Sequence, residues 1–342
     1  MDYKNLGRTG LKISAIALGS DDFGDGTSSQ VAEKIIMRSV DAGINLIDTG
    51  NLYAGGESEK IIGRTLKQNN TRHKVIISTK VDHAPRKKGV SLDKFIPEFP
   101  PNVQGNSRLN IIRACELSLK SLKTDYIDIL QVHRYYPEYH IEETLGALTD
   151  LVRQGKIRYA GCSTFPPYIL MKAIMLSEMK GLVRFALEES PYNLLDRRIE
   201  NELVPLALEH GVGILAWSPL AHGMLVGLYS NEKNYPKSSR AGARGSFYAE
   251  RITKEGINIG KKFINFAKKN GFTPAQLGVL WAKSQPGITS VLVGTRNLKH
   301  LDDLLEISEI DLDDEVKIFC DKLVSPGDFV ANFFNTSGWI KS

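Results

Sequence analysis

The segment LGSDDFGDGTSS (residues 18–29) follows the first apolar stretch of the chain and decides between two α/β folds. A doubly wound open sheet normally carries a glycine-rich phosphate turn, GxGxxG, directly after its first strand. This segment contains no such pattern. For a chain of 342 residues, we therefore favour a large closed barrel over the open sheet.

Working outward from this segment, short apolar runs alternate with amphipathic stretches along the chain. Several runs are almost continuously apolar, as parallel strands covered on both faces are. The expected strands are residues 15–18, 44–48, 75–79, 127–133, 157–163, 185–190, 213–218 and 289–294. Helical periodicity is clearest over residues 58–68, 109–122, 141–155 and 273–285. This alternation predicts a single (β/α)₈ TIM barrel domain over residues 1–342, with an N-terminal hairpin in residues 3–14.

Three segments do not fit the simple repeat. Residues 82–107 and 221–250 are long connections that each follow the carboxyl end of a strand, so we expect both on the catalytic face of the barrel. The tail, residues 325–342, is aromatic and does not have a helical pattern; its large rings are Phe329, Phe333, Phe334 and Trp339. Two interpretations of the tail remain open: a lid that lines the substrate pocket, or a segment packed on the outside of the barrel.

Composition excludes several classes of protein. The chain is 42% hydrophobic and 24% charged, without an apolar run near the ~20 residues that a membrane span needs. The N-terminal segment lacks an apolar signal core, so we expect a cytoplasmic protein. A net charge of +5 without a long basic tract argues against nucleic acid and is compatible with a phosphorylated small molecule. Scattered cysteines and histidines predict no metal site.

Polar residues end three consecutive predicted strands. Asp48 ends the second strand, Lys80 the third and His133 the fourth, and Tyr53 follows Asp48 in INLIDTGNLY (residues 44–53). Each has an ordinary alternative: Asp48 as a helix cap, Lys80 as a surface charge, His133 as a core residue. Because a barrel performs its chemistry at the carboxyl ends of its strands, the coincidence favours a catalytic group.

These four residue types suit proton donation during carbonyl reduction. A tyrosine with an ordinary pKa near ~10 is a weak acid, and an adjacent lysine ammonium stabilises its phenolate. We expect Asp48 to hold the Lys80 ammonium, Tyr53 to give up the proton, and His133 to donate a hydrogen bond to the carbonyl oxygen.

Long motifs in a fixed order carry a resemblance to the aldo-keto reductase family from about residue 3 to about residue 310. They are GRTGLKIS (7–14), INLIDTGNLY (44–53), LKTDYIDILQVH (122–133), PYNLLDR (191–197), AWSPLAHGML (216–225) and VLVGTRNLKHLDDLL (291–305). The resemblance implies an NADPH-dependent (NADP⁺-dependent) barrel without a Rossmann fold that reversibly reduces an aldehyde or ketone, with NADH as a possible cofactor. Its catalytic tetrad falls on Asp48, Tyr53, Lys80 and His133, and none of the four is replaced.

The resemblance also implies a set of cofactor-binding residues. They are Gly19, Ser20, Asp48, Ser163, Thr164, Glu189, Trp217, Ser218, Leu220, Gly223, Arg296, His300 and Asp303. Thr164, Glu189 and Leu304 depart from the commoner Asn, Gln and Asn. Arg296 favours NADPH because a guanidinium matches a phosphate, although it could also face solvent. We hypothesise that an ionised Glu189 favours the oxidised nicotinamide ring; the alternative is that it pairs with Arg158 or Lys80.

The substrate itself cannot be identified from these patterns. Phe23, Tyr135 and Tyr136 are expected to line the substrate pocket from their places beside strand ends. Phe165 and Trp217, and Phe333 of the tail, are expected there as well. A pathway-specific sugar or polyketide reductase is a second hypothesis. A third is a cofactor-sensing regulatory subunit of an ion channel, with little turnover.

Overall fold

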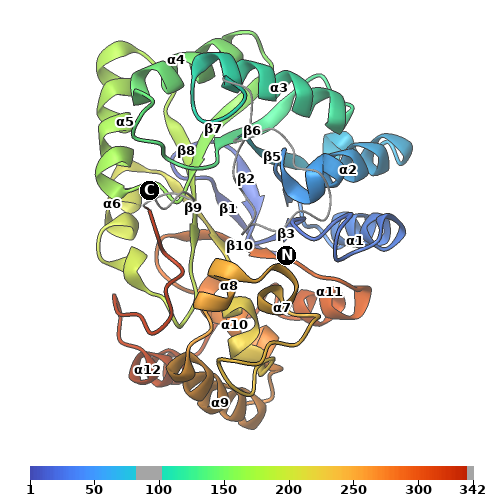
Figure 1. Ribbon diagram of the computed structural model, residues 1–342, viewed down its shortest axis with the longest axis vertical. Helices are drawn as coiled ribbons and strands as arrows, with labels where there is room; N and C mark the ends of the chain where they lie inside the picture. Colours follow the sequence, from blue (N-terminus) through green and yellow to red (C-terminus); the bar gives the residue numbers. More distant parts are fainter. Residues whose placement is uncertain (82–101, 337–342) are drawn as a thin grey trace.

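The computed structural model describes residues 1–81 and 102–336, in which parallel strands close into a barrel (Figure 1). The barrel order is β10-β3-β4-β5-β6-β7-β8-β9, with each strand hydrogen-bonded to its neighbours. The bounds of the barrel strands are β3 Ile16–Gly19, β4 Leu46–Asp48, β5 Ile76–Val81, β6 Ile127–Val132, β7 Ile157–Ser163, β8 Phe185–Pro191, β9 Gly213–Trp217 and β10 Ile288–Val293. All eight predicted strands are confirmed, and so is the closed barrel.

A layer of helices surrounds the barrel (Figure 1). The longer helices are α1 Ser29–Asp41, α2 Glu57–Gln68, α3 Arg108–Leu122, α4 Ile141–Arg153, α5 Pro167–Lys180, α6 Leu203–His210, α9 Lys254–Lys269, α10 Pro274–Lys283, α11 Leu298–Leu305 and α12 Asp314–Leu323. The four helical patterns seen in the sequence correspond to α2, α3, α4 and α10. Oxygen-bearing side chains cap several of the helices, as Ser28 does for α1 and Thr273 for α10.

Alternation along the strands sends polar side chains to one end of the barrel interior. Successive side chains point to opposite faces of a strand, so Leu46 and Asp48 share the interior face of β4. Apolar interior residues such as Leu46, Ile76 and Ile129 belong to one buried cluster. Polar groups occupy the interior positions nearer the carboxyl ends, which places the charged site above an apolar floor.

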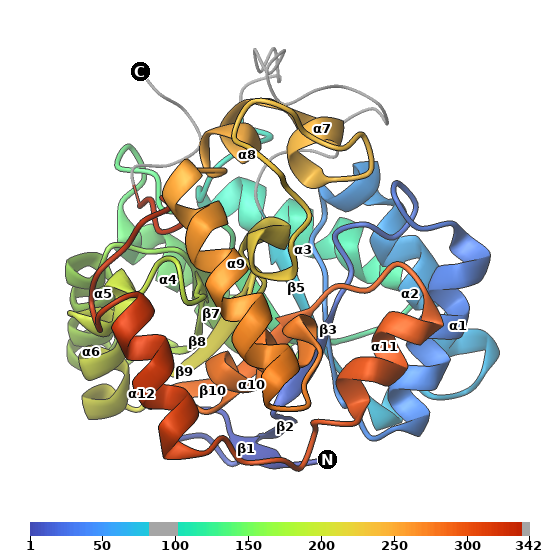
Figure 2. The same ribbon diagram turned by 90° about the horizontal axis from the view of Figure 1, so that it is seen from below.

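The N-terminal hairpin closes the opposite end of the barrel. Strands β1 Tyr3–Asn5 and β2 Lys12–Ser14 pair antiparallel, which confirms the predicted hairpin. Leu6 and Ile13 are fully buried in the cluster that contains the apolar floor. Gly213 permits this contact, because a Cβ there would lie 2.5 Å from Leu6. Figure 2 shows the hairpin at one end of the molecule and the connection containing α7 and α8 at the other.

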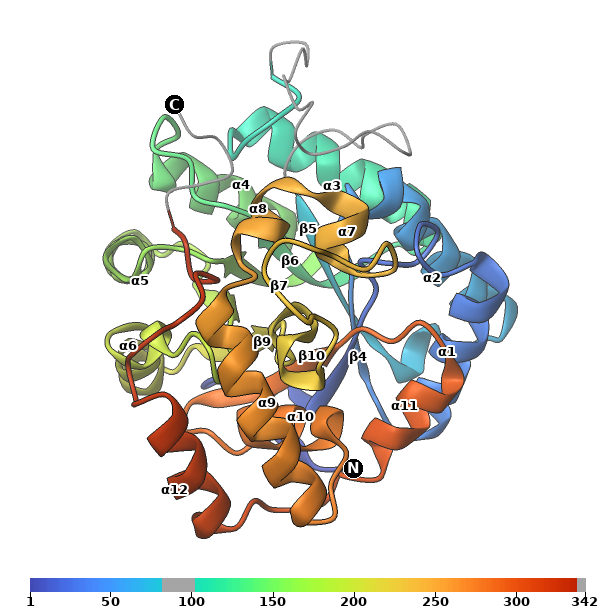
Figure 3. The same ribbon diagram turned by 60° about the horizontal axis from the view of Figure 1, so that its bottom comes forward.

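The long connection after β9 is more ordered than a plain loop. It contains the 3-10 segment η5 Ala221–Val226 and the short helices α7 Arg240–Arg244 and α8 Ser246–Glu250, which lie across the carboxyl end of the barrel (Figure 3). Of the other predicted connection, residues 82–101 lie outside the described residues. No helix in the described ranges is long and apolar enough to cross a membrane.

The described part of the tail packs at the rim of the barrel. The chain after α12 runs up the side of the molecule toward α8 in Figures 2 and 3. Phe333 is buried, whereas Phe329 is half exposed beside Arg198. The carboxylate of Asp196 accepts the backbone N–H groups of Phe333 and Phe334, each at 2.7 Å. Trp339 lies outside the described residues.

Candidate active site

Neighbouring strand ends bring three of the predicted catalytic residues into one buried group. Asp48 ends β4, Lys80 is the second-last residue of β5, and His133 directly follows β6. Lys80 donates to the Asp48 carboxylate and, at 3.1 Å, to the carbonyl of Thr49. Lys80 is fully buried and Asp48 nearly so, which excludes the surface-charge and helix-cap alternatives.

Glu189 completes an ion triad around Lys80. Its Oε2 lies 3.0 Å from Lys80 Nζ, so the pairing alternative for Glu189 is observed with Lys80 as the partner. Burial acts to lower the pKa of Lys80, but Asp48 and Glu189 together hold it well above its usual value. Burial and then Glu189 raise the pKa of Asp48, against the opposing effect of Lys80. The triad therefore has two acids competing for one ammonium.

Gln131 joins the two carboxylates across the barrel. Its side-chain amide lies 2.8 Å from Glu189 Oε2, 3.3 Å from Asp48 Oδ1 and 2.7 Å from Ser78 Oγ. A side chain at position 161 would obstruct this arrangement, because a Cβ on Gly161 would approach Gln131 Cγ to 3.0 Å. Gly161 thus leaves the room that Gln131 needs to hold both acids in fixed orientations.

Tyr53 lies over this triad and beside His133. It begins η1 Tyr53–Gly56, after a turn in which the Tyr53 N–H bonds the Gly50 carbonyl at 3.0 Å. Lys80 Nζ is 5.1 Å from the centroid of the phenol ring, and the His133 ring stands edge-on at 6.1 Å. Burial raises the pKa of Tyr53, and Lys80 opposes that rise. Tyr53 is therefore a protonated donor with a cation close to its ring.

A cavity of about 590 Å³ opens above these residues. Most of the predicted cofactor residues line it: Gly19, Ser20, Asp48, Ser163, Glu189, Trp217, Ser218, Leu220, Gly223, Arg296 and His300. Tyr53, His133 and Leu304 line it as well. The cavity thus connects the triad end with the segment that carries Arg296.

Two predicted cofactor residues lie outside the cavity as the described residues define it. Thr164 is buried with a φ of 52°, and its N–H bonds the Glu189 carbonyl at 3.0 Å. Asp303 accepts the hydroxyl of Thr273 at 3.0 Å, so it supports the start of α10 instead of facing the cavity.

The predicted substrate residues divide in a similar way. Phe23 lines the cavity. Phe165 is instead fully buried in the core, with ring centroids 5.7 Å from Phe185 and 5.8 Å from Tyr135, because the positive φ of Thr164 turns the chain inward. Tyr136 packs on Tyr139, and Phe333 lies behind two lining residues, His222 and Arg251.

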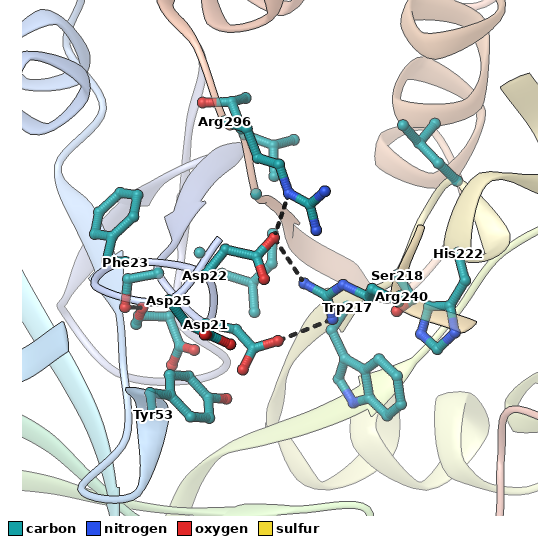
Figure 4. Close-up of a pocket in the computed structure, with 18 of the residues that line it drawn as sticks. Asp21, Asp22, Phe23, Asp25, Tyr53, Trp217, Ser218, His222, Arg240 and Arg296 are labelled. Atoms are coloured by element: carbon teal, nitrogen blue, oxygen red, sulfur yellow. Dashed lines mark hydrogen bonds and ion pairs between the residues drawn. The ribbon is translucent and has the colours of Figure 1, made fainter. Parts of the chain in front are cut away.

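An ionic cluster at the cavity wall was missed from the sequence. Asp21 and Asp22 follow β3, and they pair with arginines from α7 and from the segment after β10 (Figure 4). Arg240 lies 3.0 Å from Asp21, and Arg244 lies 2.7 Å from Asp21 and 3.1 Å from Asp22. Arg296 donates to Asp22 at 2.9 Å. Two features of the sequence could have predicted this cluster. They are the adjacent acids in SDDFGD (residues 20–25) and the two arginines in SSRAGAR (residues 238–244).

Comparison with known proteins defines the class to which this site belongs. Residues 15–324 match the model of the aldo/keto reductase family. The chain belongs to this family, and it is an oxidoreductase by that membership.

Individual relatives cover nearly the whole chain. It is 34% identical to "Uncharacterized oxidoreductase YrpG" of Bacillus subtilis (strain 168), over 96% of this chain and 97% of that protein. It is 31% identical to "Aldo-keto reductase dtxS3" of Metarhizium robertsii, over 95% and 92% of the two chains. It is also 31% identical to "Probable voltage-gated potassium channel subunit beta" of Arabidopsis thaliana, over 92% and 95%.

Proposed function

We propose that this protein is an NADPH-dependent reductase of aldehydes or ketones, with Tyr53 as the proton donor. One observation carries the proposal: Lys80, bonded to Asp48, approaches the Tyr53 ring at the floor of a cavity that His133 and Trp217 also line. A buried acid, a cation beside it and a hydrogen-bonding imidazole are the groups that carbonyl reduction requires.

The cavity has the features that a bound NADPH would need. Ser218 and His222 have positive φ values of 57° and 53°, in a turn that bends sharply along the cavity. The buried hydroxyl of Thr295 has no hydrogen-bond partner among the described residues, and Thr295 lines the cavity together with Arg296. Trp217 would pack against the nicotinamide and Arg296 would bind the 2′-phosphate. NADPH, when bound, supplies the hydride.

The protein's own residues would then manage the proton. Tyr53 holds its proton at neutral pH because burial raises its pKa. His133 would orient the carbonyl oxygen, and the phenol would protonate that oxygen as negative charge develops on it. The Lys80 ammonium would stabilise the resulting phenolate until solvent reprotonates it.

The test is NADPH oxidation with 4-nitrobenzaldehyde, repeated with Tyr53→Phe and with NADH. The proposal expects turnover by the wild type and a loss of at least about hundredfold in Tyr53→Phe, because general acid catalysis contributes about that much or more. NADPH binding, followed by quenching of tryptophan fluorescence, should survive the substitution. Equal turnover by both proteins would overturn the role of Tyr53.

The named potassium channel subunit among the relatives favours a second candidate, a cofactor-binding regulatory subunit. This candidate predicts tight NADPH binding with negligible turnover of every carbonyl tested. Rapid reduction of 4-nitrobenzaldehyde would exclude it.

A further inference from the structure

The outer face of α5 is apolar. Tyr168 is 69% exposed, Met175 50% and Met179 77%, and Met171 beside them is half-buried. These residues are spaced by three, four and four positions, so they lie on one face of the helix. Figures 1 and 3 show α5 in the outer layer of helices, at the edge of the molecule. A contiguous apolar face in this position is typical of a protein interaction site.

The fold itself does not require this outer face. The inner face of α5 already packs on the barrel, through Ile169, Leu170, Ala173, Ile174 and Ser177. The neighbouring helix α4 shows the usual arrangement, because its exposed residues include Glu142, Glu143 and Arg153. The methionines of α5 therefore stand where charged side chains would serve the fold equally well.

The methionines form a row that suits packing against another helix. Met171, Met175 and Met179 are four residues apart, so they make one of the i±4 ridges of the helix surface. Two helices that align such ridges cross at about −50°, the commonest angle between packed helices. When both helices belong to copies of one chain, a twofold axis can run along the row, and each copy then presents the same surface to the other.

Charged residues flank the row on opposite sides. Lys172 lies on one side and Glu178 on the other, at equal distances along the chain from Met175. A twofold axis along the row exchanges the two sides, so it brings Lys172 of one copy opposite Glu178 of the second copy. The α5 surface is thus complementary in charge to itself.

Both charges are available for this contact. Lys172 is exposed and forms no ion pair within the described part of the chain. Glu178 is 56% exposed; its Oε1 accepts from Arg184 and lies 3.9 Å from Arg8, whereas its Oε2 has no such partner in residues 1–81 and 102–336. Glu178 is therefore oriented by its own chain and keeps one oxygen for a lysine of the second copy.

We propose that the protein forms a homodimer through α5, with the methionine rows packed together and Lys172 of each copy paired with Glu178 of the other. A single pair of helices buries less than the roughly 1,600 Å² of a standard stable interface, so we expect a Kd on the order of 1–10 µM. The dimer does not depend on the proposed reductase function.

The test is sedimentation velocity of the wild type and of Met175→Glu, from about 1 to 100 µM protein, a range that brackets the expected Kd. The wild type should change from monomer to dimer, and Met175→Glu should remain a monomer because it places two like charges together at the axis. Leu117→Glu replaces an exposed apolar residue of α3 and is the matched control, which should dimerise like the wild type. A wild type that stays monomeric at the highest concentration, or a dimer unaffected by Met175→Glu, would overturn the proposal.

The charged pair is tested by Lys172→Glu and Lys172→Gln. Lys172→Glu sets like charges opposite each other at two symmetry-related places, so Kd should rise by about 5- to 50-fold. Lys172→Gln only removes the attraction and should raise Kd by less than about fivefold. Equal dimerisation of all three proteins would show that Lys172 and Glu178 do not face each other, which contradicts the proposed arrangement.

A disulfide can report the arrangement of the helices directly. Met175 lies on the proposed axis, so in Met175→Cys the two introduced thiols meet, and oxidised glutathione should link two copies. The chain's own cysteines are buried and should not react. Leu117→Cys, an exposed position on α3, should remain unlinked under the same conditions. Equal linking of both variants would mean random collision and would contradict the proposal, even if Met175→Glu failed to fold.

Discussion

Glu189 Oε2 lies 3.0 Å from Lys80 Nζ, so the Lys80 ammonium is shared between two carboxylates, Glu189 and Asp48. Gln131 holds both acids in place from the other side. A protonated lysine whose charge is balanced by two carboxylates stabilises a neighbouring phenolate less than a lysine paired with a single carboxylate. The extra carboxylate therefore has consequences for the pH dependence and for the cofactor.

Replacing Glu189 by Gln should shift the pH profile of carbonyl reduction. Burial raises the pKa of Tyr53, Lys80 lowers it, and Asp48 and Glu189 raise it again. Removing the Glu189 charge therefore lowers the pKa of Tyr53. The pH at which kcat/KM for reduction falls on the alkaline side should decrease by about 1 pH unit. Steady-state rates from pH 6 to 11 measure this fall. Glu59→Gln, a buried acid outside the cavity, is the control; superimposed Glu189→Gln and wild-type profiles would contradict the prediction.

The same substitution tests whether Glu189 favours the oxidised cofactor. A buried carboxylate near the nicotinamide stabilises a positive ring, although Lys80 compensates part of the charge. Glu189→Gln should therefore weaken NADP⁺ binding relative to NADPH by about three- to tenfold, which corresponds to at most ~1.4 kcal/mol. Fluorescence titrations give both Kd values. An unchanged ratio would show that Lys80 cancels the Glu189 charge completely.

Removing Lys80 should destabilise the fold as well as stop catalysis. Lys80→Met leaves Asp48 and Glu189 buried without their cation, which should lower the free energy of unfolding by about 3–5 kcal/mol in urea titrations. The variant Lys80→Met/Asp48→Asn/Glu189→Gln removes the charges together, so it should recover much of the stability but none of the activity.

A second buried lysine provides the matched control for that experiment. Lys283 bonds the carbonyls of Ile307 and Ser308 and the half-exposed Asp2, and it is not among the residues that line the cavity. Lys283→Met should keep its activity and lose less stability than Lys80→Met, because no carboxylate is left buried. An equal loss in both variants would mean that lost packing, and not the uncompensated charges, dominates.

The strands and the grouping of polar side chains at their ends were predictable because both follow from local periodicity. Apolar runs marked the strands, and polar residues at their carboxyl ends marked Asp48, Lys80 and His133. The pairing of Glu189 with Lys80 was one of two alternatives, since the strand pattern places both inside the barrel without fixing the distance.

Other features depended on backbone geometry that no periodic pattern records. The positive φ of Thr164 turns Phe165 into the core, although its sequence position suggested the pocket. The contact between Asp22 and Arg296 joins residues 274 positions apart through two connections. Loops bring such charges together according to their three-dimensional paths, and opposite charges are too common in a sequence to identify the pairs.

Arg296 should determine the preference for NADPH over NADH. Its guanidinium lines the cavity, bonded to Asp22 at 2.9 Å and to the Ser238 carbonyl at 2.5 Å. Arg296→Met should raise KM for NADPH by about 10- to 100-fold and leave KM for NADH nearly unchanged, because only NADPH carries the 2′-phosphate.

Asp22→Asn removes a carboxylate that competes with the 2′-phosphate for Arg296, so this variant should lower KM for NADPH. Arg38→Met, at an exposed ion pair with Asp302, is the control. Equal effects on both cofactors would assign Arg296 a structural role.

Glu188 should make the fold less stable as the pH rises. This carboxyl is fully buried, where it accepts from Ser190 Oγ at 2.7 Å and Phe165 N at 3.3 Å and contacts Cys162 Sγ at 3.0 Å. Burial raises its pKa from 4.5 to about 8, so between those values the folded state keeps a proton that the unfolded state releases. The free energy of unfolding therefore falls as the pH rises across that window, and Glu188→Gln removes this contribution.

The measurement is the free energy of unfolding of Glu188→Gln and of the wild type in urea titrations at pH 5, 7 and 8.5. The difference, variant minus wild type, should increase by on the order of 1–4 kcal/mol between pH 5 and pH 8.5. Glu59, whose pKa burial raises to about 6, is present in both proteins and cancels in the difference. Parallel curves would mean that Glu188 is ionised in the folded protein throughout this range.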